Sequence, residues 1–240
     1  MNATPGHRPR RNVIADVHAL GRCFLLLGLL LVLLLIGPLF PHGPSDEPPL
    51  PLRILDALVL VAAVIALSAK RWTLIVAIIL AVPAMVTHFG STHVRNGDDW
   101  LESLRIPSGI LFNLFACGLI MTYAVRSGLH VRHRLAGAAC AYLLLGFTFA
   151  SGFALIDTLQ GPALSYFGQP AVPLSWNDIQ YFSFCTLTTV GYGDFSALVP
   201  AARALATLEA ICGVLFVAVF ISALVGEAAA ARSAPAHPAA

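Results

Sequence analysis

Charged side chains are scarce in this sequence. Asp, Glu, Lys and Arg make up 11% of its 240 residues, while hydrophobic residues make up 58%. A soluble domain carries about a quarter charged residues, so this composition excludes an ordinary soluble domain and indicates a membrane protein. The formal net charge is only +2 and the basic residues are spread along the chain, so we expect no nucleic-acid partner.

Cysteine is also scarce, and nothing in the spacing of its five positions pairs them. The cysteines stand in apolar segments without CxxC or metal-ligand spacing, which predicts small buried hydrophobic residues rather than disulfides or a metal site. They are Cys23, Cys117, Cys140, Cys185 and Cys212. No nucleophile–base pair is evident either, so we expect neither an enzyme nor a bound cofactor.

A secretory cleavage site is missing where one would be expected. Arg8, Arg10, Arg11 and Arg22 precede a leucine-rich run, as in a signal peptide, but Gly37-Pro38 follows the run instead of a small-x-small pattern. We therefore expect a first transmembrane helix that is retained.

Six long apolar segments predict six transmembrane helices, because each is close to the ~20 residues that cross a bilayer. They run over residues 23–40, 52–69, 72–89, 106–125, 135–157 and 203–226. Basic residues gather at alternate junctions and acidic residues at the others, which predicts that both termini are cytoplasmic. The expected location is the plasma (inner) membrane, with the chain crossing it several times.

The segment Thr188–Asp194, with the sequence TTVGYGD, lies between the last two apolar segments. Gly191 and Gly193 permit backbone dihedrals of alternating hand, and such a backbone can present a row of carbonyl oxygens to a dehydrated cation. Val190 and Tyr192 would then point outward, and the Thr189 hydroxyl would add a further oxygen layer.

In this setting the sequence resembles the selectivity filter of potassium channels, closely over residues 176–226 and loosely over 135–174. The resemblance implies an all-α membrane protein with six transmembrane helices, a re-entrant pore helix and a filter loop. It also implies a homotetramer that conducts K⁺ passively through the bilayer. The K⁺ ligands would come from Thr189, Val190, Gly191 and Tyr192, and the filter would extend over Thr188, Thr189, Val190, Gly191, Tyr192, Gly193 and Asp194.

A pore helix is predicted over residues 176–187, with Ser175 as its N-cap and Asp178 completing a capping box. Trp176, Tyr181, Phe182 and Cys185 would support the filter. Some relatives carry a glutamate nine residues before the filter aspartate, where it pairs with that aspartate. Cys185 occupies the position here, so Asp194 would instead bond to Tyr181 or Trp176, or attract cations at the outer mouth.

Two residues of the sixth apolar segment stand out. Glu209 is its one internal charge, and we expect it to support the back of the filter. Gly213 matches the gating-hinge position of the family, and a packing notch is the equally open alternative.

The fourth apolar segment lacks the arginine ladder of a voltage sensor, so steep voltage gating is not expected. The predicted organisation is an N-terminal tail (1–22), a four-helix membrane domain (23–126), a pore domain (127–226) and a C-terminal tail (227–240). No sequence motif indicates what opens the channel, so regulation by an unidentified ligand or lipid remains an open alternative. A potassium transporter subunit and a non-conducting membrane sensor with the pore fold remain alternatives.

Overall fold

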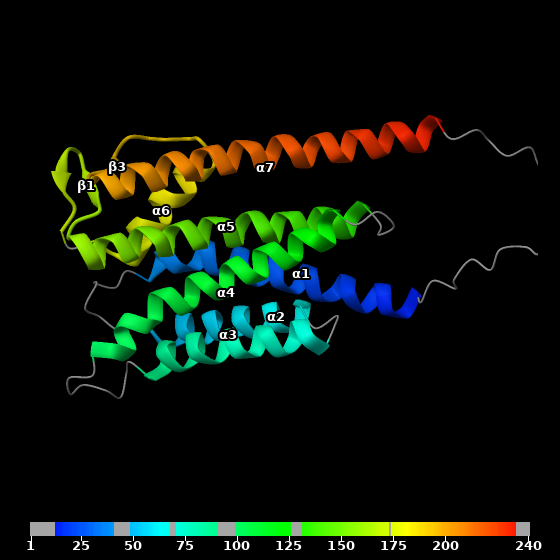
Figure 1. Cartoon of the computed structure of the whole chain (residues 1–240), viewed down its shortest axis with the longest axis horizontal. Helices are drawn as coiled ribbons and strands as arrows, with labels where there is room; N and C mark the ends of the chain where they lie inside the picture. The colour runs from blue at the N-terminus through cyan, green and yellow to red at the C-terminus, as the bar shows by residue number, and fades with distance from the viewer. Residues whose placement is uncertain are drawn as a thin grey trace, which may run out of the picture.

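The computed structural model describes residues 13–40, 49–67, 71–90, 99–125, 131–172 and 174–233. Long helices dominate it and run roughly side by side (Figure 1). They are α1 (Val13–Ile36), α2 (Leu50–Leu67), α3 (Arg71–Gly90), α4 (Asp99–Val125), α5 (Val131–Gln160) and α7 (Pro200–Ser233). A short 3₁₀ turn, η1 (Gly37–Leu39), ends α1, and a shorter helix, α6 (Trp176–Leu187), precedes the filter segment.

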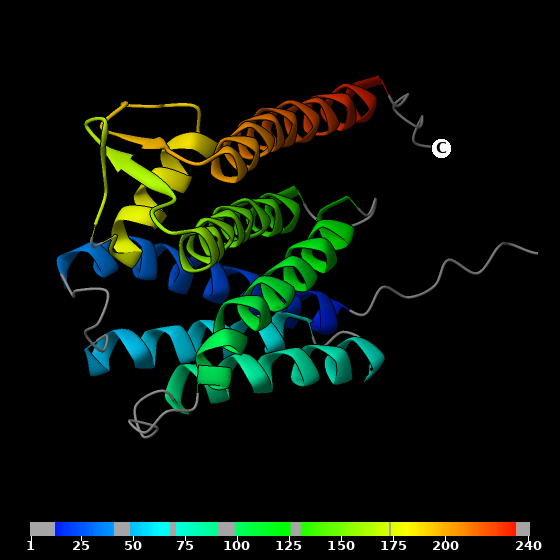
Figure 2. The same cartoon turned by 60° about the vertical axis from the view of Figure 1, so that its left-hand side comes forward.

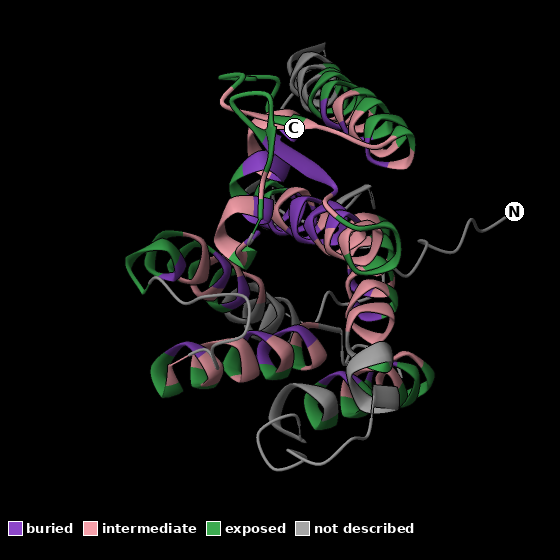
Figure 3. Cartoon of the chain, turned by 90° about the vertical axis from the view of Figure 1, so that its left-hand side faces the viewer, coloured by how far each residue is buried: buried purple, intermediate pink, exposed green. Residues whose placement is uncertain are grey.

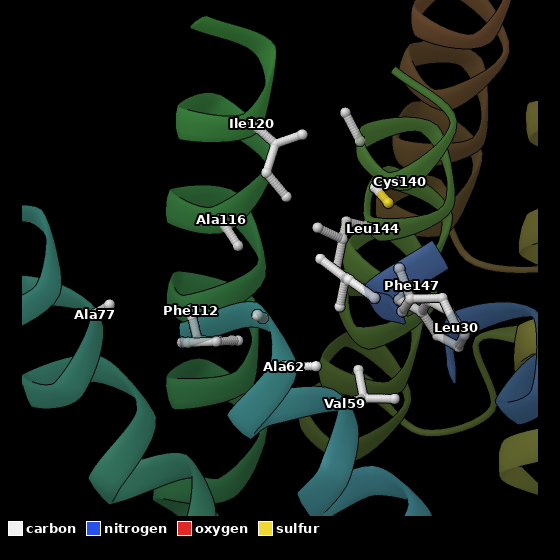
Figure 4. Packing of buried hydrophobic residues seen from close by; sticks show 13 residues of the cluster. Leu30, Val59, Ala62, Ala77, Phe112, Ala116, Ile120, Cys140, Leu144 and Phe147 are labelled. Atoms are coloured by element: carbon white, nitrogen blue, oxygen red, sulfur yellow. The ribbon is translucent and has the colours of Figure 1, made fainter. Parts of the chain in front are cut away.

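Helix α5 divides the molecule into two parts. α4 and α1 both pack against α5, with α2 and α3 beyond them, while α6 and α7 lie on the other side (Figures 1 and 2). Apolar side chains from all five of the first helices form one core, including Leu30 of α1, Phe112 of α4 and Leu144 of α5 (Figure 4). A second core joins α5, α6 and α7 and includes Phe153, Phe182 and Ala202.

A small sheet lies at the end of the bundle where α7 begins (Figure 1). Its strands are β1 (Leu164–Tyr166), β2 (Gln169–Pro170) and β3 (Phe195–Ala197), in the order β2-β1-β3 with antiparallel pairing. The turn between β1 and β2 has positive φ at Phe167 (46°) and Gly168 (79°), the geometry of a tight hairpin turn. The all-α prediction did not include this sheet, which forms on the two segments that flank α6 and the filter.

The predicted helical segments exist, but several boundaries differ. α1 begins at Val13, well before the expected start at 23, and the predicted N-terminal tail is otherwise outside the described residues. α4 begins at Asp99, before the expected start at 106, and continues through Pro107 without a break. The proline removes one backbone donor but leaves the rest of the helical ladder intact.

Two helices of the described residues are long and apolar enough to cross a membrane by length and composition: Arg134–Gln160 and Pro200–Phe220. Three further apolar helical segments are shorter, namely Cys23–Leu39, Arg71–Val86 and Ile106–Thr122. The chain is therefore consistent with a mostly helical membrane protein, and the number of six spans stays a prediction.

Candidate functional site

Helix α6 begins where its capping residues place it. The Ser175 hydroxyl oxygen accepts from the Asp178 backbone amide at 3.2 Å, and an Asp178 carboxylate oxygen accepts from the Ser175 amide at 3.2 Å. This capping box satisfies amides that the first helical turn leaves free. The helix spans Trp176–Leu187, as the sequence predicts.

The filter segment turns back against the last turn of α6. The amides of Val190 and Gly191 both donate to the Cys185 carbonyl, at 2.9 and 3.3 Å, and the Thr189 amide donates to the Thr186 carbonyl at 3.0 Å. The chain after α6 then runs back towards β3 as an extended segment (Figure 2). Cys185 was expected to support the filter, and the contact that the structure shows is through its backbone carbonyl.

The backbone of the filter segment alternates in hand. φ is positive at Thr189 (60°), Gly191 (54°) and Gly193 (83°), and the intervening Val190 and Tyr192 are not among the residues of positive φ. The expectation of alternating dihedrals is therefore met at both glycines. Thr189 was not foreseen in this role, and a β-branched residue in the left-handed region is strained.

This alternation leaves a row of carbonyl groups without backbone partners. Among the described residues, no backbone amide donates to the carbonyl oxygens of Thr189, Val190, Gly191 or Tyr192. The same residues are exposed to solvent in the single chain. Free carbonyl oxygens on consecutive residues are the ligand type that a dehydrated alkali cation takes in a channel filter.

Aromatic rings connect the filter segment to the sheet. Tyr192 stacks on Tyr181 of α6, with ring centroids 6.3 Å apart and nearly parallel planes. Tyr181 in turn meets Phe195 of β3 edge-on at 6.1 Å, and Phe195 lies 4.9 Å from Tyr166 of β1. Tyr181 thus contacts the filter as expected, yet Tyr192 keeps 73% of its surface exposed within one chain.

Asp194 is held from two sides. Its backbone carbonyl accepts from the Phe167 amide at 2.9 Å, which attaches the end of the filter to the hairpin turn. The phenol of Tyr181 also lies close to the Asp194 carboxylate and interacts with it. Of the two bonding partners that the sequence left open for Asp194, Tyr181 is the one that lies close to it, and the attraction of cations at the outer mouth stays a prediction.

The other two aromatics that were predicted to support the filter are Phe182 and Trp176 of α6. Phe182 is buried and packs edge-on against Phe153 of α5, with centroids 5.0 Å apart. This contact attaches α6 to α5, and support of the filter by Phe182 stays a prediction. Trp176 is the first residue of α6, at the opposite end of the helix from the filter segment, and is partly exposed.

Two polar contacts that the sequence reasoning did not find attach α6 to its neighbours. The Tyr142 hydroxyl of α5 donates to the Leu187 carbonyl at 3.1 Å. The Ser183 hydroxyl lies 2.8 Å from the Gly146 carbonyl oxygen of α5 and 2.5 Å from Oε1 of Glu209 on α7. Each contact is long-range in sequence, so no local pattern pointed to Tyr142 or Ser183.

Glu209 and Gly213 both lie where α7 meets α6. Glu209 is fully buried and contacts Ser183 in the middle of the pore helix, as expected of a residue behind the filter. Gly213 lies against the end of α6, where an added Cβ would collide with the Leu187 carbonyl oxygen and come within 3.0 Å of its carbon. This contact gives Gly213 a packing reason to be glycine, and its role as a hinge stays a prediction.

Residues 141–228, from α5 through α6 and the filter segment into α7, match the family described as ion channel. Over these residues the chain is similar to the ion channel family. The chain is also similar to the inward rectifier potassium channel Kirbac3.1 of Paramagnetospirillum magnetotacticum, with 46% identity over 52 residues. The matched stretch covers 22% of this chain and 18% of that channel. The resemblance to the potassium channel family is thus confirmed over residues 141–228, while α1 to α4 lie outside the family match.

Proposed function

We propose that the chain is a subunit of a potassium-selective channel that conducts K⁺ passively. The observation that carries the proposal is the row of unpartnered carbonyl groups at Thr189 to Tyr192, on a backbone that alternates in hand. Carbonyl oxygens replace the hydration shell of K⁺ only if several surround the ion at once. The similarity to a potassium channel and the match to an ion channel family support this choice of ion.

The proposed assembly is a homotetramer. One chain holds one filter segment, and a carbonyl cage in this family takes four such segments around one axis. Within a single chain only 11% of the apolar stretch of α7 is buried, compared with 56% for α5. Exposed residues line much of α7 in the end-on view (Figure 3). This apolar surface and the exposed filter would be covered by neighbouring subunits and lipid.

The proposed location is the plasma membrane, with both chain termini in the cytoplasm. The alternation of basic and acidic junctions supports this orientation. The filter segment and the sheet would then face the outside, because they lie at the end of the bundle that is distant from the start of α1 (Figure 1). The pore helix would direct the negative end of its dipole towards the permeating ion.

The role of α1 to α4 in this channel is structural support rather than voltage sensing. Residues 106–125 of α4 carry no basic residue, and α4 packs along α5 with small and aromatic apolar side chains. Shallow voltage dependence from ions moving in the filter is compatible with this proposal. A regulatory ligand or lipid that acts through these helices is left open.

The proposal is tested with purified protein in lipid vesicles. Vesicles loaded with K⁺ should release it when a proton carrier balances the charge, at a rate proportional to the amount of protein. A transporter subunit would need a second ion or energy source, and a non-conducting sensor would give no release under any condition. Release of K⁺ that requires a second ion or an energy source would contradict the channel proposal, and so would the absence of any release.

A further inference from the structure

Glu209 occupies an unusual position for a carboxyl group. Its side chain is 0% exposed, and its Oε2 atom is buried without a hydrogen-bond partner among the described residues. The other oxygen, Oε1, lies 2.5 Å from the Ser183 hydroxyl. A buried carboxylate normally needs a base or several donors, because the cost of removing a full charge from water is large.

The described residues around Glu209 supply no such base. Three helices pack together here, α5, α6 and α7, and Ser183 is the one side-chain partner that the structure gives Glu209. On α7, Arg203 lies six residues before Glu209, about 9 Å along the helix. On α5, Arg134 lies twelve residues before Gly146, about 18 Å away along the axis. The other titratable side chains described on these helices are Tyr142, Cys140, Asp157, Asp178, Tyr181, Cys185 and Cys212.

The contacts of Ser183 indicate whether the Glu209 carboxyl group carries a proton. A serine hydroxyl holds one hydrogen, and the Ser183 oxygen lies within hydrogen-bond distance of two oxygen atoms, the Gly146 carbonyl at 2.8 Å and Glu209 Oε1 at 2.5 Å. If Glu209 were ionised, both neighbours would only accept, and one of these short contacts would hold no hydrogen. If Glu209 carries a proton, it donates to Ser183 and Ser183 donates to Gly146, so both contacts become hydrogen bonds.

We propose that Glu209 is a neutral carboxylic acid whose proton completes a hydrogen-bond chain from α7 through Ser183 of the pore helix to α5. It acts as a positioning residue, since the side-chain contact that the structure gives it is with Ser183 of the pore helix and not with a filter carbonyl group. The chain of hydrogen bonds fixes the middle of α6. The filter backbone is in turn hydrogen-bonded to the last turn of α6 through the Cys185 carbonyl. This inference rests on the proposed channel function only for its effect on K⁺ flux.

The proton is tested directly by infrared spectroscopy of the reconstituted protein. A protonated carboxyl group absorbs at higher frequency than a carboxylate, and the wild type minus Glu209→Gln difference should show one such band. Ser183→Ala should keep the band but shift it, because the acid loses its acceptor. Asp56→Asn, which removes a carboxyl group of α2, is the matched control and should leave the Glu209 band in place. Absence of the band in wild type would overturn the proposal.

The positioning role is tested by K⁺ flux from the same vesicles. Glu209→Ala should reduce flux about tenfold or more, because Ser183 loses a buried donor and a cavity opens behind the filter. Glu209→Gln should restore flux, since its amide can donate to Ser183 without any charge. A glutamine variant as inactive as the alanine variant would contradict a neutral donor. Wild-type protein without flux would instead refute the channel proposal. The infrared band would still show whether Glu209 is protonated.

Discussion

Gly213 of the inner helix lies directly against the carbonyl group of Leu187, the last residue of the pore helix. A Cβ at position 213 would collide with that oxygen, and backbone cannot move aside as the end of a flexible side chain does. The same oxygen accepts the Tyr142 hydroxyl. The C-terminal end of the pore helix is thus set by α5 and α7 together, immediately before the filter segment begins.

Gly213→Ala should therefore destabilise the assembled protein by about 1–3 kcal/mol, through overpacking. The thermal midpoint of the assembly in detergent measures the effect. Gly226→Ala is the matched control on the same helix, since a Cβ there meets no atom within 4 Å. If Gly213 acted only as a hinge, the alanine variant would keep its stability and change only its gating.

Tyr142→Phe should lower stability by about 1 kcal/mol, because the Leu187 carbonyl loses its side-chain donor while the ring stays in contact with Phe216. The comparison is Thr158→Ala on the same helix, whose hydroxyl donates to the Ala154 carbonyl of its own helix. Thermal midpoints and sustained K⁺ flux should fall for the tyrosine variant and remain near wild type for the threonine variant. Equal behaviour of the two variants would show that the Tyr142 bond does not hold the pore helix.

Gly191→Ala should abolish K⁺ flux. Position 191 has φ of 54°, where a Cβ costs about 1–2 kcal/mol, and the strain falls on the proposed ion ligands. Gly168→Ala carries a similar strain at φ of 79°, but it lies in the hairpin turn. It should lose stability and keep its selectivity for K⁺ over Na⁺. Unchanged selectivity in the Gly191 variant would disprove the filter assignment.

Opening should be nearly independent of membrane potential. Moving one charge across the membrane contributes about 2.3 kcal/mol per 100 mV, and steep gating takes roughly three to four such charges per subunit. The apolar part of α4 offers none, and Arg105 and Arg126 stand outside it. Single-channel records at strongly negative and positive potentials measure this. An open probability that changes e-fold over a few millivolts would reveal a sensor that the account lacks.

Local signals made the pore helix predictable to the residue. Ser175 and Asp178 define its start, and the glycine-containing filter motif defines its end, so no long-range information was needed. The sheet was not predictable in this way, because β1 pairs with β3 across the whole of α6 and the filter. Neither Leu164–Tyr166 nor Phe195–Ala197 is long enough to show an alternating pattern of its own.

The residues of the candidate site were likewise predictable only where a local signal exists. The glycines at 191 and 193 could be assigned from the backbone that a carbonyl row requires, whereas the left-handed conformation of Thr189 follows from the turn that the chain makes against Cys185 and Thr186. Glu209 was noticed because a charge in an apolar segment is conspicuous. Its partner Ser183 and the hydrogen bond from Tyr142 to Leu187 were not predicted. A serine or tyrosine in a helix gives no sequence signal of its partner until the helices are placed side by side.

The central claim is that the carbonyl row from Thr189 to Tyr192 selects K⁺, and a reversal potential tests it most directly. Purified protein in a planar bilayer, with K⁺ on one side and Na⁺ on the other, should give currents that reverse close to the K⁺ equilibrium potential. Gly191→Ala should give no K⁺ current in the same bilayer. Wild-type currents that reverse near zero would mean that the pore does not distinguish the two ions, and would contradict the account.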